Sequence, residues 1–252
     1  MTERKVAVVT GAAAGIGAGI AKELAESGYA VAAVDIDEAG ARSMAESLRV
    51  HSPALAIAAD IAAEEQVKRA VETAIQEFGF ISVLINNAGI ELNGSVTELS
   101  AAEWDRQIAV NLRGAFLMSR HAIPAMRKRG GSIIHISSVH AFVSWAGCAA
   151  YDTTKAGLLG LTRAMALDHG PDGIRVNAIC PGYIDTPLME KWLASVPDRG
   201  ATMREVLSAH PLGRIGTPRD VAQAALFLAS DAASFISGTF LVVDGAMSAA
   251  GH

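Results

Sequence analysis

Short apolar runs alternate with longer segments of helical spacing along the whole chain, and this alternation constrains the fold more than any other feature. The runs have the length of buried strands, and the segments between them repeat their apolar residues with a helical period. Strands that alternate with helices form a parallel sheet covered on both faces through right-handed crossovers. The predicted strands are residues 6–9, 30–34, 55–59, 83–85, 132–136, 176–179 and 240–243, and the predicted helices include 17–27, 64–78, 102–126, 150–170 and 219–229. We therefore expect a doubly wound α/β fold.

The composition favours one self-sufficient domain over residues 1–252. The chain has 252 residues, 51% of them hydrophobic, so it can bury a large core without a metal or disulfides. No linker, repeat or low-complexity segment divides it. A formal net charge of −5 argues against a nucleic-acid partner. Residues 131–151 lack Asp, Glu, Lys and Arg but are too polar for a membrane span.

Cysteine usage points to a reducing compartment. Cys148 and Cys180 form neither a CxxC pair nor a metal-binding spacing. We therefore expect no metal site and no disulfide framework, and the simplest interpretation is a cytoplasmic protein.

A glycine-rich turn joins the first predicted strand to the first predicted helix. The stretch VAVVTGAAAGIG contains Gly11, Gly15 and Gly17. Glycines permit a tight turn and close approach to a pyrophosphate, which the helix N-terminus attracts through its free N–H groups. The spacing is GxxxGxG rather than GxGxxG, so the strand before it and the helix after it carry much of the argument. The alternative is a glycine-rich turn that only packs.

An acidic residue ends the second predicted strand. Asp35 can accept hydrogen bonds from the adenosine ribose hydroxyls of a dinucleotide and would repel a 2′-phosphate. Its neighbour Ile36 and the loop residue Ala14 supply no cation for that phosphate. The pattern predicts NAD rather than NADP, although a strand-end aspartate that caps a turn is also common.

One region breaks the rhythm of strands and helices. Residues 181–218 hold many of the prolines and show no clear strand. A long irregular segment in a compact domain is usually functional. We expect a loop over about residues 183–215 that acts as a substrate lid beyond the carboxyl ends of the strands.

The stretch YDTTK places Tyr151 and Lys155 on one face of a predicted helix, because residues four apart are neighbours on a helix surface. A tyrosine ionises near pH 10, and a nearby ammonium lowers that pKa. Tyr151 would then exchange a proton with an alcohol as general base in oxidation and general acid in reduction. The alternative for an isolated Tyr/Lys pair is a solvated helix edge.

Taken together, these stretches resemble the short-chain dehydrogenase/reductase family over essentially the whole chain. The resemblance rests on TGAAAGIG, Asp60-Ile61, NNAG, VNLRG, ISS, YDTTK, RVNAICPGYIDTP and VVDGA. It implies a single domain with a Rossmann-like, seven-stranded parallel sheet, a nicotinamide cofactor and, commonly, a homotetramer.

The resemblance also assigns a catalytic set of Asn111, Ser138, Tyr151 and Lys155. It implies that Lys155 holds the nicotinamide ribose and that Asn111 helps hold a proton-relay water near Lys155. Asn is unfavourable inside a helix because its amide competes for backbone groups, so its presence there favours a specific role. The alternative is an Asn without such a role on the solvent-exposed face of the helix. Ser138 would hydrogen-bond the substrate oxygen. Ser137 is the competing residue, and the family's serine-to-tyrosine spacing favours Ser138.

The remaining cofactor contacts are implied by the resemblance residue by residue. Asn87, Ala88 and Gly89 line the adenosine and ribose side, and Asp60 and Ile61 flank the adenine. Pro181, Gly182, Ile184 and Thr186 approach the nicotinamide. The expected cofactor-binding residues are Gly11, Ala14, Gly15, Ile16, Gly17, Asp35, Ile36, Asp60, Ile61, Asn87, Ala88, Gly89, Tyr151, Lys155, Pro181, Gly182, Ile184 and Thr186.

Substrate recognition is less constrained. The residues between Ser138 and Tyr151 and those in the proline-bearing segment should border the substrate; they are His140, Phe142, Trp145, Cys148, Tyr183, Met189 and Trp192. Two interpretations remain open. The histidine and tryptophans bind a polyhydroxylated ring, or they are solvated or pack the lid or a subunit interface.

The predicted activity is an NAD-dependent oxidation of a secondary alcohol to a ketone, the substrate being a sugar, polyol or hydroxy acid. The alternative enzyme is a 3-oxoacyl-[acyl-carrier-protein]-type carbonyl reductase, against which Asp35 argues because such enzymes usually prefer NADPH. A non-catalytic nucleotide-binding protein is the third hypothesis. It would need the glycine turn but not the catalytic set.

Overall fold

A single seven-stranded parallel sheet forms the centre of the molecule. The computed structural model describes residues 4–127 and 129–249, and its strand order is β3-β2-β1-β4-β5-β6-β7. The strands are β1 (Val6–Thr10), β2 (Ala30–Asp35), β3 (Ala54–Ala58), β4 (Val83–Asn86), β5 (Gly131–Ile136), β6 (Ile174–Pro181) and β7 (Phe240–Val243). All neighbouring strands pair in parallel. The predicted doubly wound, Rossmann-like fold is confirmed, and each predicted strand is present with ends shifted by at most two residues.

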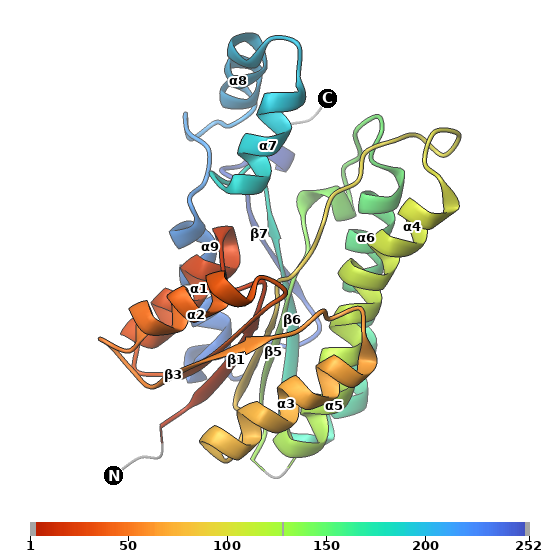
Figure 1. Ribbon diagram of the computed structural model, residues 1–252. Coiled ribbons are helices and arrows are strands. Elements are labelled where there is room, and N and C mark those ends of the chain that lie inside the picture. The colour runs from red at the N-terminus through yellow and green to blue at the C-terminus, as the bar shows by residue number, and fades with distance from the viewer. Residues whose placement is uncertain (1–3, 128, 250–252) are drawn as a thin grey trace.

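Helices cover both faces of the sheet (Figure 1). On one face lie α1 (Gly15–Glu26), α2 (Glu38–Leu48) and α9 (Pro218–Ala229). On the other lie α3 (Glu64–Phe78), α5 (Gly114–Met126) and α6 (Ala149–His169), with α4 (Ala101–Ile108) leading into α5. Short single turns occur at Val139–Ala141, Gly170–Asp172, Asp231–Ala233 and Met247–Ala249.

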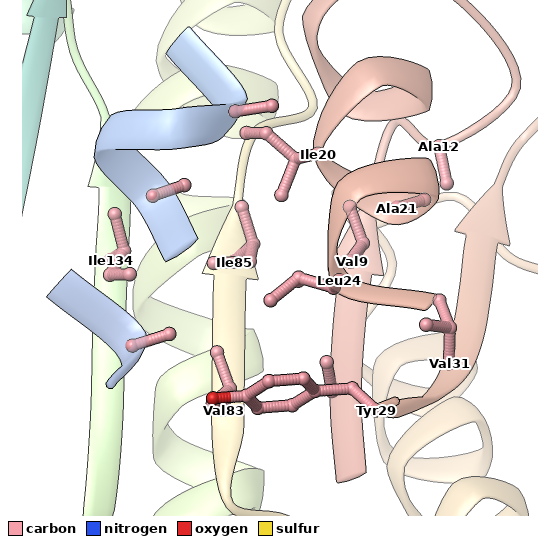
Figure 2. Packing of buried hydrophobic residues seen from close by; sticks show 14 of the residues in the cluster. Val9, Ala12, Ile20, Ala21, Leu24, Tyr29, Val31, Val83, Ile85 and Ile134 are labelled. Atoms are coloured by element: carbon pink, nitrogen blue, oxygen red, sulfur yellow. The ribbon is translucent and has the colours of Figure 1, made fainter. Parts of the chain in front are cut away.

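Each strand of the sheet centre is buried on both sides, which explains why these strands are apolar throughout. Successive side chains point to opposite faces of a strand. Val9 and Ile85 therefore pack against Ile20 of α1 on one face, whereas Val8 belongs to the separate core on the other face. Figure 2 shows the first of these cores, with Ile134 of β5 on the same side of the sheet.

The long helix predicted over residues 102–126 is interrupted. It begins one residue earlier, at Ala101, because Ser100 and Glu103 form a reciprocal capping box. A π-helical turn then occupies Ala109–Arg113 before the helix continues as α5. Such turns insert one residue into the helical ladder and are frequent at functional sites. Here the turn contains Asn111.

The proline-bearing segment is not the irregular loop that the sequence predicted. It contains two helices, α7 (Pro187–Ser195) and α8 (Arg199–Ser208), beyond the carboxyl end of β6 (Figure 1). Pro187 starts α7 rather than breaking it, because the first helical position needs no backbone N–H donor. Thr186 and Asp198 cap the two helices with their side chains. The pair has its own small core of Met189, Leu193 and Val206.

Candidate active site

The sheet order reverses at β1, and a cleft of about 650 Å³ opens at the carboxyl ends of the strands around that point. In doubly wound sheets this crevice is the position where ligands bind. All the expected cofactor and substrate residues of the sequence line it, apart from Gly17 and Phe142, and so do three of the four catalytic residues. These lining residues are Gly11, Ala14, Gly15, Ile16, Asp35, Ile36, Asp60, Ile61, Asn87, Ala88, Gly89, Ser138, His140, Trp145, Cys148, Tyr151, Lys155, Pro181, Gly182, Tyr183, Ile184, Thr186, Met189 and Trp192.

The glycine turn presents an open helix N-terminus to the cleft. Gly11 and Gly15 have φ angles of 65° and 57°, which side chains disfavour. Ala14 precedes α1 without a side-chain cap, so the first N–H groups of the helix keep their capacity for an anion. These features fit a dinucleotide pyrophosphate.

Gly17, which the sequence predicts as a cofactor-binding residue, does not line the cleft and supports the glycine turn from the protein interior. It is buried, and an added Cβ would lie 2.0 Å from the Gly11 carbonyl oxygen. The side-chain Nδ2 of Asn87 lies 2.4 Å from the same position, and it donates to the carbonyls of Thr10 and Gly11 at 2.9 and 3.1 Å. The absent side chain therefore lets β1, α1 and the end of β4 come together.

The Asp35 carboxylate is fixed at the end of β2. Its two oxygens accept hydrogen bonds from the backbone N–H groups of Ala13, at 2.9 Å, and Asp37, at 3.0 Å. It thus shares the cleft wall with the glycine turn. The nearby Arg106 lines the same part of the cleft, but its guanidinium pairs with Asp60 at 3.3 Å. This end of the cleft fits the adenosine ribose of a nicotinamide dinucleotide.

Lys155 is buried next to Tyr151. Its Nζ donates to the Ile136 carbonyl oxygen at 2.9 Å and lies 5.3 Å from the centroid of the Tyr151 ring. Burial lowers the pKa of Lys155 to about 8, since removal from water disfavours the ammonium.

The pKa of Tyr151 contradicts the expectation from the sequence. It is raised above the usual value near 10, because burial removes water from the phenolate and the Glu91 carboxylate adds negative charge. A hydrogen bond with Ser138 acts in the opposite direction but is weaker. The neighbouring lysine is therefore insufficient on its own to produce a phenolate near neutral pH in the free protein.

The two serines after β5 have different surroundings. The Ser137 hydroxyl donates to the Lys155 carbonyl oxygen at 2.8 Å and so ties the strand to α6. The Ser138 oxygen accepts from the backbone N–H of His140 at 3.2 Å, and the same side chain hydrogen-bonds Tyr151. Ser138 is thus the serine whose hydroxyl lies beside Tyr151.

Asn111 is buried in the π-helical turn, which rules out the solvent-face alternative. It does not line the cleft directly. Its amide forms two hydrogen bonds of 2.8 Å with the backbone N–H and carbonyl of Ile90, and it also donates to Thr154 at 3.3 Å. Asn111 therefore connects the segment after β4 to Thr154 of α6, which is the residue before Lys155.

The expected substrate residues form one aromatic and polar wall. His140 Nδ1 and the Asp152 carboxylate are 2.5 Å apart, and the His140 ring lies 4.4 Å from Trp145 and 5.1 Å from Tyr151 between centroids. Tyr183 continues this wall, since its ring centroid lies 6.5 Å from that of Trp145 and its ring stacks on Trp192 with centroids 5.6 Å apart. Both tryptophans thus border the cleft.

Phe142 is the exception among these residues. It does not line the cleft; it is exposed and stacks on Phe240 of β7 with ring centroids 5.7 Å apart. The short turn at Val139–Ala141 directs the chain away from Tyr151 after His140.

Sequence reasoning missed three features of the site. The Thr10 hydroxyl oxygen accepts hydrogen bonds from the backbone N–H groups of Asn87 and Ala88, at 3.0 and 3.1 Å. Glu91 lines the cleft near Tyr151, His140 and Lys155. The donor atoms of His140, Cys148 and Asp152, called here the His-Cys-Asp cluster, lie within 4.8 Å of one another. The position of Glu91 two residues after the NNAG stretch was an available signal, whereas the cluster depends on tertiary contacts.

None of the helices in the described part of the chain combines the length and apolar character needed to cross a bilayer.

Comparisons with known proteins agree with this geometry. Residues 11–248 match the family described as "Enoyl-(Acyl carrier protein) reductase". The chain is 44% identical over 249 residues to a cis-4-hydroxycyclohexanecarboxylate dehydrogenase of Sinomonas cyclohexanicum, and the match covers 97% of each chain.

Solved structures give the same result. The ligand-free aldohexose dehydrogenase of Thermoplasma acidophilum is 41% identical with a TM-score of 0.89, and the match covers 99% of this chain and 96% of that one. A 3-ketoacyl-(acyl-carrier-protein) reductase of Brucella melitensis in complex with NADH is 37% identical with a TM-score of 0.88, covering 98% of this chain and 100% of the other.

Proposed function

The chain belongs to the short-chain dehydrogenase/reductase family, and on that premise we propose that it oxidises a secondary alcohol to a ketone, preferring NAD as cofactor. It is an oxidoreductase, as are the related dehydrogenases. The observation that carries the proposal is the pairing of the partly buried Tyr151 with the buried Lys155, with Ser138 bonded to Tyr151, in a cleft that also contains the glycine turn.

In the proposed mechanism Tyr151 takes the proton from the alcohol oxygen while the Ser138 hydroxyl hydrogen-bonds the same oxygen. Lys155 lies close enough to favour the phenolate electrostatically. A bound oxidised nicotinamide dinucleotide would accept the hydride that leaves the carbinol carbon, and its positive ring would add to the charge that favours phenolate. In the reverse direction Tyr151 returns the proton to the carbonyl oxygen.

Asn111 acts through its neighbours in this proposal. By binding the Ile90 backbone and Thr154, it holds the segment after β4 against α6 next to Lys155. A water near Lys155 would then pass the proton from the site to solvent.

The preference for NAD rests on Asp35. Its carboxylate would meet the 2′-phosphate of NADP at short range, and the one arginine that lines the cleft among the described residues, Arg106, already pairs with Asp60. Removal of a phosphate dianion from water next to a carboxylate without a compensating cation is unfavourable.

A reductase of 3-oxoacyl thioesters is the second candidate. It is favoured by the Brucella melitensis relative, which is 37% identical and was solved with NADH, and by the name of the matching family. That enzyme would use the same catalytic set in the reducing direction.

We also propose that the protein is a cytoplasmic homotetramer. Both cysteines are free, which suits a reducing compartment. Phe240, Leu241 and Val242 of the edge strand β7 are exposed, and Phe142 extends the same apolar surface. A monomer mass by light scattering at micromolar concentration would contradict the assembly.

The test of the activity is an initial-rate survey of sugars, polyols, hydroxy acids, simple secondary alcohols and an acetoacetyl thioester. Each is run with NAD and NADP, or with their reduced forms. The proposal predicts NADH formation from an alcohol, with NAD clearly preferred. Turnover with NADP alone would contradict the cofactor assignment, and robust reduction of the thioester without alcohol oxidation would favour the second candidate.

A further inference from the structure

The segment after β4 is held unusually firmly for a stretch without regular structure. The Ile90 backbone bonds on both sides to the buried amide of Asn111, and the Leu92 N–H donates to the buried Gln107 side chain at 2.8 Å. Further along, Gly94 forms an isolated bridge with Cys148, and its N–H donates to the Gly147 carbonyl at 2.6 Å. Glu91 lies between these anchors, so its place in the cleft wall is fixed.

The Glu91 carboxylate is partly buried and has no hydrogen bond or ion pair within residues 4–127 and 129–249. Burial raises its pKa, while His140 and Lys155 act in the opposite direction. The Lys155 ammonium, which acts electrostatically on Glu91, already donates to the Ile136 carbonyl. A carboxylate without a protein partner in a ligand cleft is a group prepared for a hydrogen-bond donor.

This carboxylate also works against the catalytic tyrosine, because its charge raises the pKa of Tyr151. The proposed proton transfer does not need Glu91. The position of Glu91 in the cleft is therefore better explained by a role in substrate binding.

His140 supplies a second polar group near Glu91 in the cleft. His140 Nδ1 donates to the Asp152 carboxylate, so that nitrogen carries a proton. Nε2 of His140 makes no hydrogen bond or ion pair within the described residues and stays available to a ligand. The His140 ring is 5.1 Å from the Tyr151 ring between centroids. The Glu91 carboxylate and Nε2 of His140 thus both lie near the tyrosine, and both can form a hydrogen bond with a hydroxyl, which donates as well as accepts.

Resting on the proposed dehydrogenase function, we propose that Glu91, assisted by His140, binds a second hydroxyl of the substrate close to the reacting carbon. The site then selects neutral diols, polyols or sugars. It disfavours a substrate with a carboxylate next to the reacting carbon, because Glu91 and Asp152 bring negative charge to this wall and Lys155 is committed elsewhere. Glu91 is a specificity-determining residue in this assignment, whereas Tyr151 does the proton chemistry.

The test compares matched substrates on two frames. One set is cyclohexanol, cis-cyclohexane-1,2-diol and 2-hydroxycyclohexanecarboxylate; the other is propan-2-ol, propane-1,2-diol and lactate. We expect the wild type to show the highest kcat/KM for the diol of a frame and the lowest for the hydroxy acid. Glu91→Gln keeps the shape and removes the charge.

For Glu91→Gln we expect kcat/KM for the diol to fall roughly 10- to 100-fold, as for loss of a hydrogen bond to a charged group. The value for the monoalcohol should change little, and that for the hydroxy acid should rise. The matched control is Glu72→Gln, an exposed position on α3 outside the cleft, which should leave all values unchanged.

The outcomes separate this inference from the proposed function. No turnover of any alcohol with either cofactor contradicts the dehydrogenase function itself. Turnover in which the hydroxy acid equals or exceeds the diol overturns the role of Glu91 and leaves that function standing. An equal fall for all three substrates in Glu91→Gln overturns it as well, since that pattern indicates a structural effect. If this variant does not fold, the wild-type ranking alone decides.

Discussion

Replacement of Gly17 by alanine tests how the glycine turn positions the cofactor. The added Cβ would lie 2.0 Å from the Gly11 carbonyl oxygen and 2.4 Å from Asn87 Nδ2. Both atoms are constrained, since the first is backbone and the second donates to the carbonyls of Thr10 and Gly11. The clash cannot be relieved by rotating a free side chain. The turn and the end of β4 must move apart instead.

The size of that movement follows from the contact distance. Real Cβ atoms stay at least 3.0 Å from such neighbours, so a 2.0 Å approach requires a shift of about 1 Å. Misplacement of binding groups by that amount costs on the order of 100-fold, equivalent to about 2.7 kcal/mol. Overpacking should also lower the free energy of unfolding by about 1–3 kcal/mol. We therefore predict that Gly17→Ala raises the NADH dissociation constant about 100-fold and lowers the melting temperature.

Fluorescence titration with NADH and thermal melting measure the two effects. Gly200→Ala is the matched control, because a Cβ there would come no closer than 3.4 Å to any atom and the residue lies in the first turn of α8. It should bind NADH like the wild type and melt at an equal or higher temperature, since alanine favours a helix. An unchanged NADH affinity in Gly17→Ala would refute the reasoning.

Three further predictions follow from the electrostatics of the cleft. In the cofactor-free protein Tyr151 should remain a phenol up to about pH 10, because burial and Glu91 raise its pKa; wild type and Tyr151→Phe should therefore show the same tyrosinate absorbance below that pH, and extra phenolate in the wild type would contradict the cause. Asp35→Ala should raise kcat/KM for NADP relative to NAD by about tenfold or more, as expected for removal of one repulsive charge; an unchanged ratio would show that Asp35 does not set the preference. Dialysis against EDTA should leave activity intact, because the Cys148 thiol has a pKa raised to about 11 and His140 is already bonded to Asp152, which makes the His-Cys-Asp cluster a poor metal site at neutral pH; lost activity that Zn²⁺ restores would refute this.

The sheet was predictable because local pattern and tertiary role agree along it. Strands such as β1 and β5 are buried on both faces and are therefore continuous apolar runs, which are easily recognised. The glycine turn and the place of Asp35 at a strand end were also predictable from the sequence, because backbone conformation and charge act locally there. Helical spacing predicted that Tyr151 and Lys155 share one helix face, whereas their expected catalytic role came from the other motifs and the family resemblance.

Features that depend on long-range contacts were not predictable in this way. The π-helical turn around Asn111 reflects hydrogen bonds to Ile90, which is 21 positions away. The two helices of the proline-bearing segment were missed because Pro187 suggests a break although it occupies the first turn of α7. The expected pKa of Tyr151 was wrong in direction, because the sequence shows the neighbouring lysine but neither the burial nor the approach of Glu91.

The central claim is that Tyr151 manages the proton of the substrate hydroxyl. The most direct test is the turnover of Tyr151→Phe with the best alcohol found for the wild type, alongside its NADH affinity. The account predicts that kcat falls at least about 100-fold, as for loss of a general acid–base group, while the NADH dissociation constant stays close to that of the wild type. Turnover within a few-fold of the wild type would contradict it.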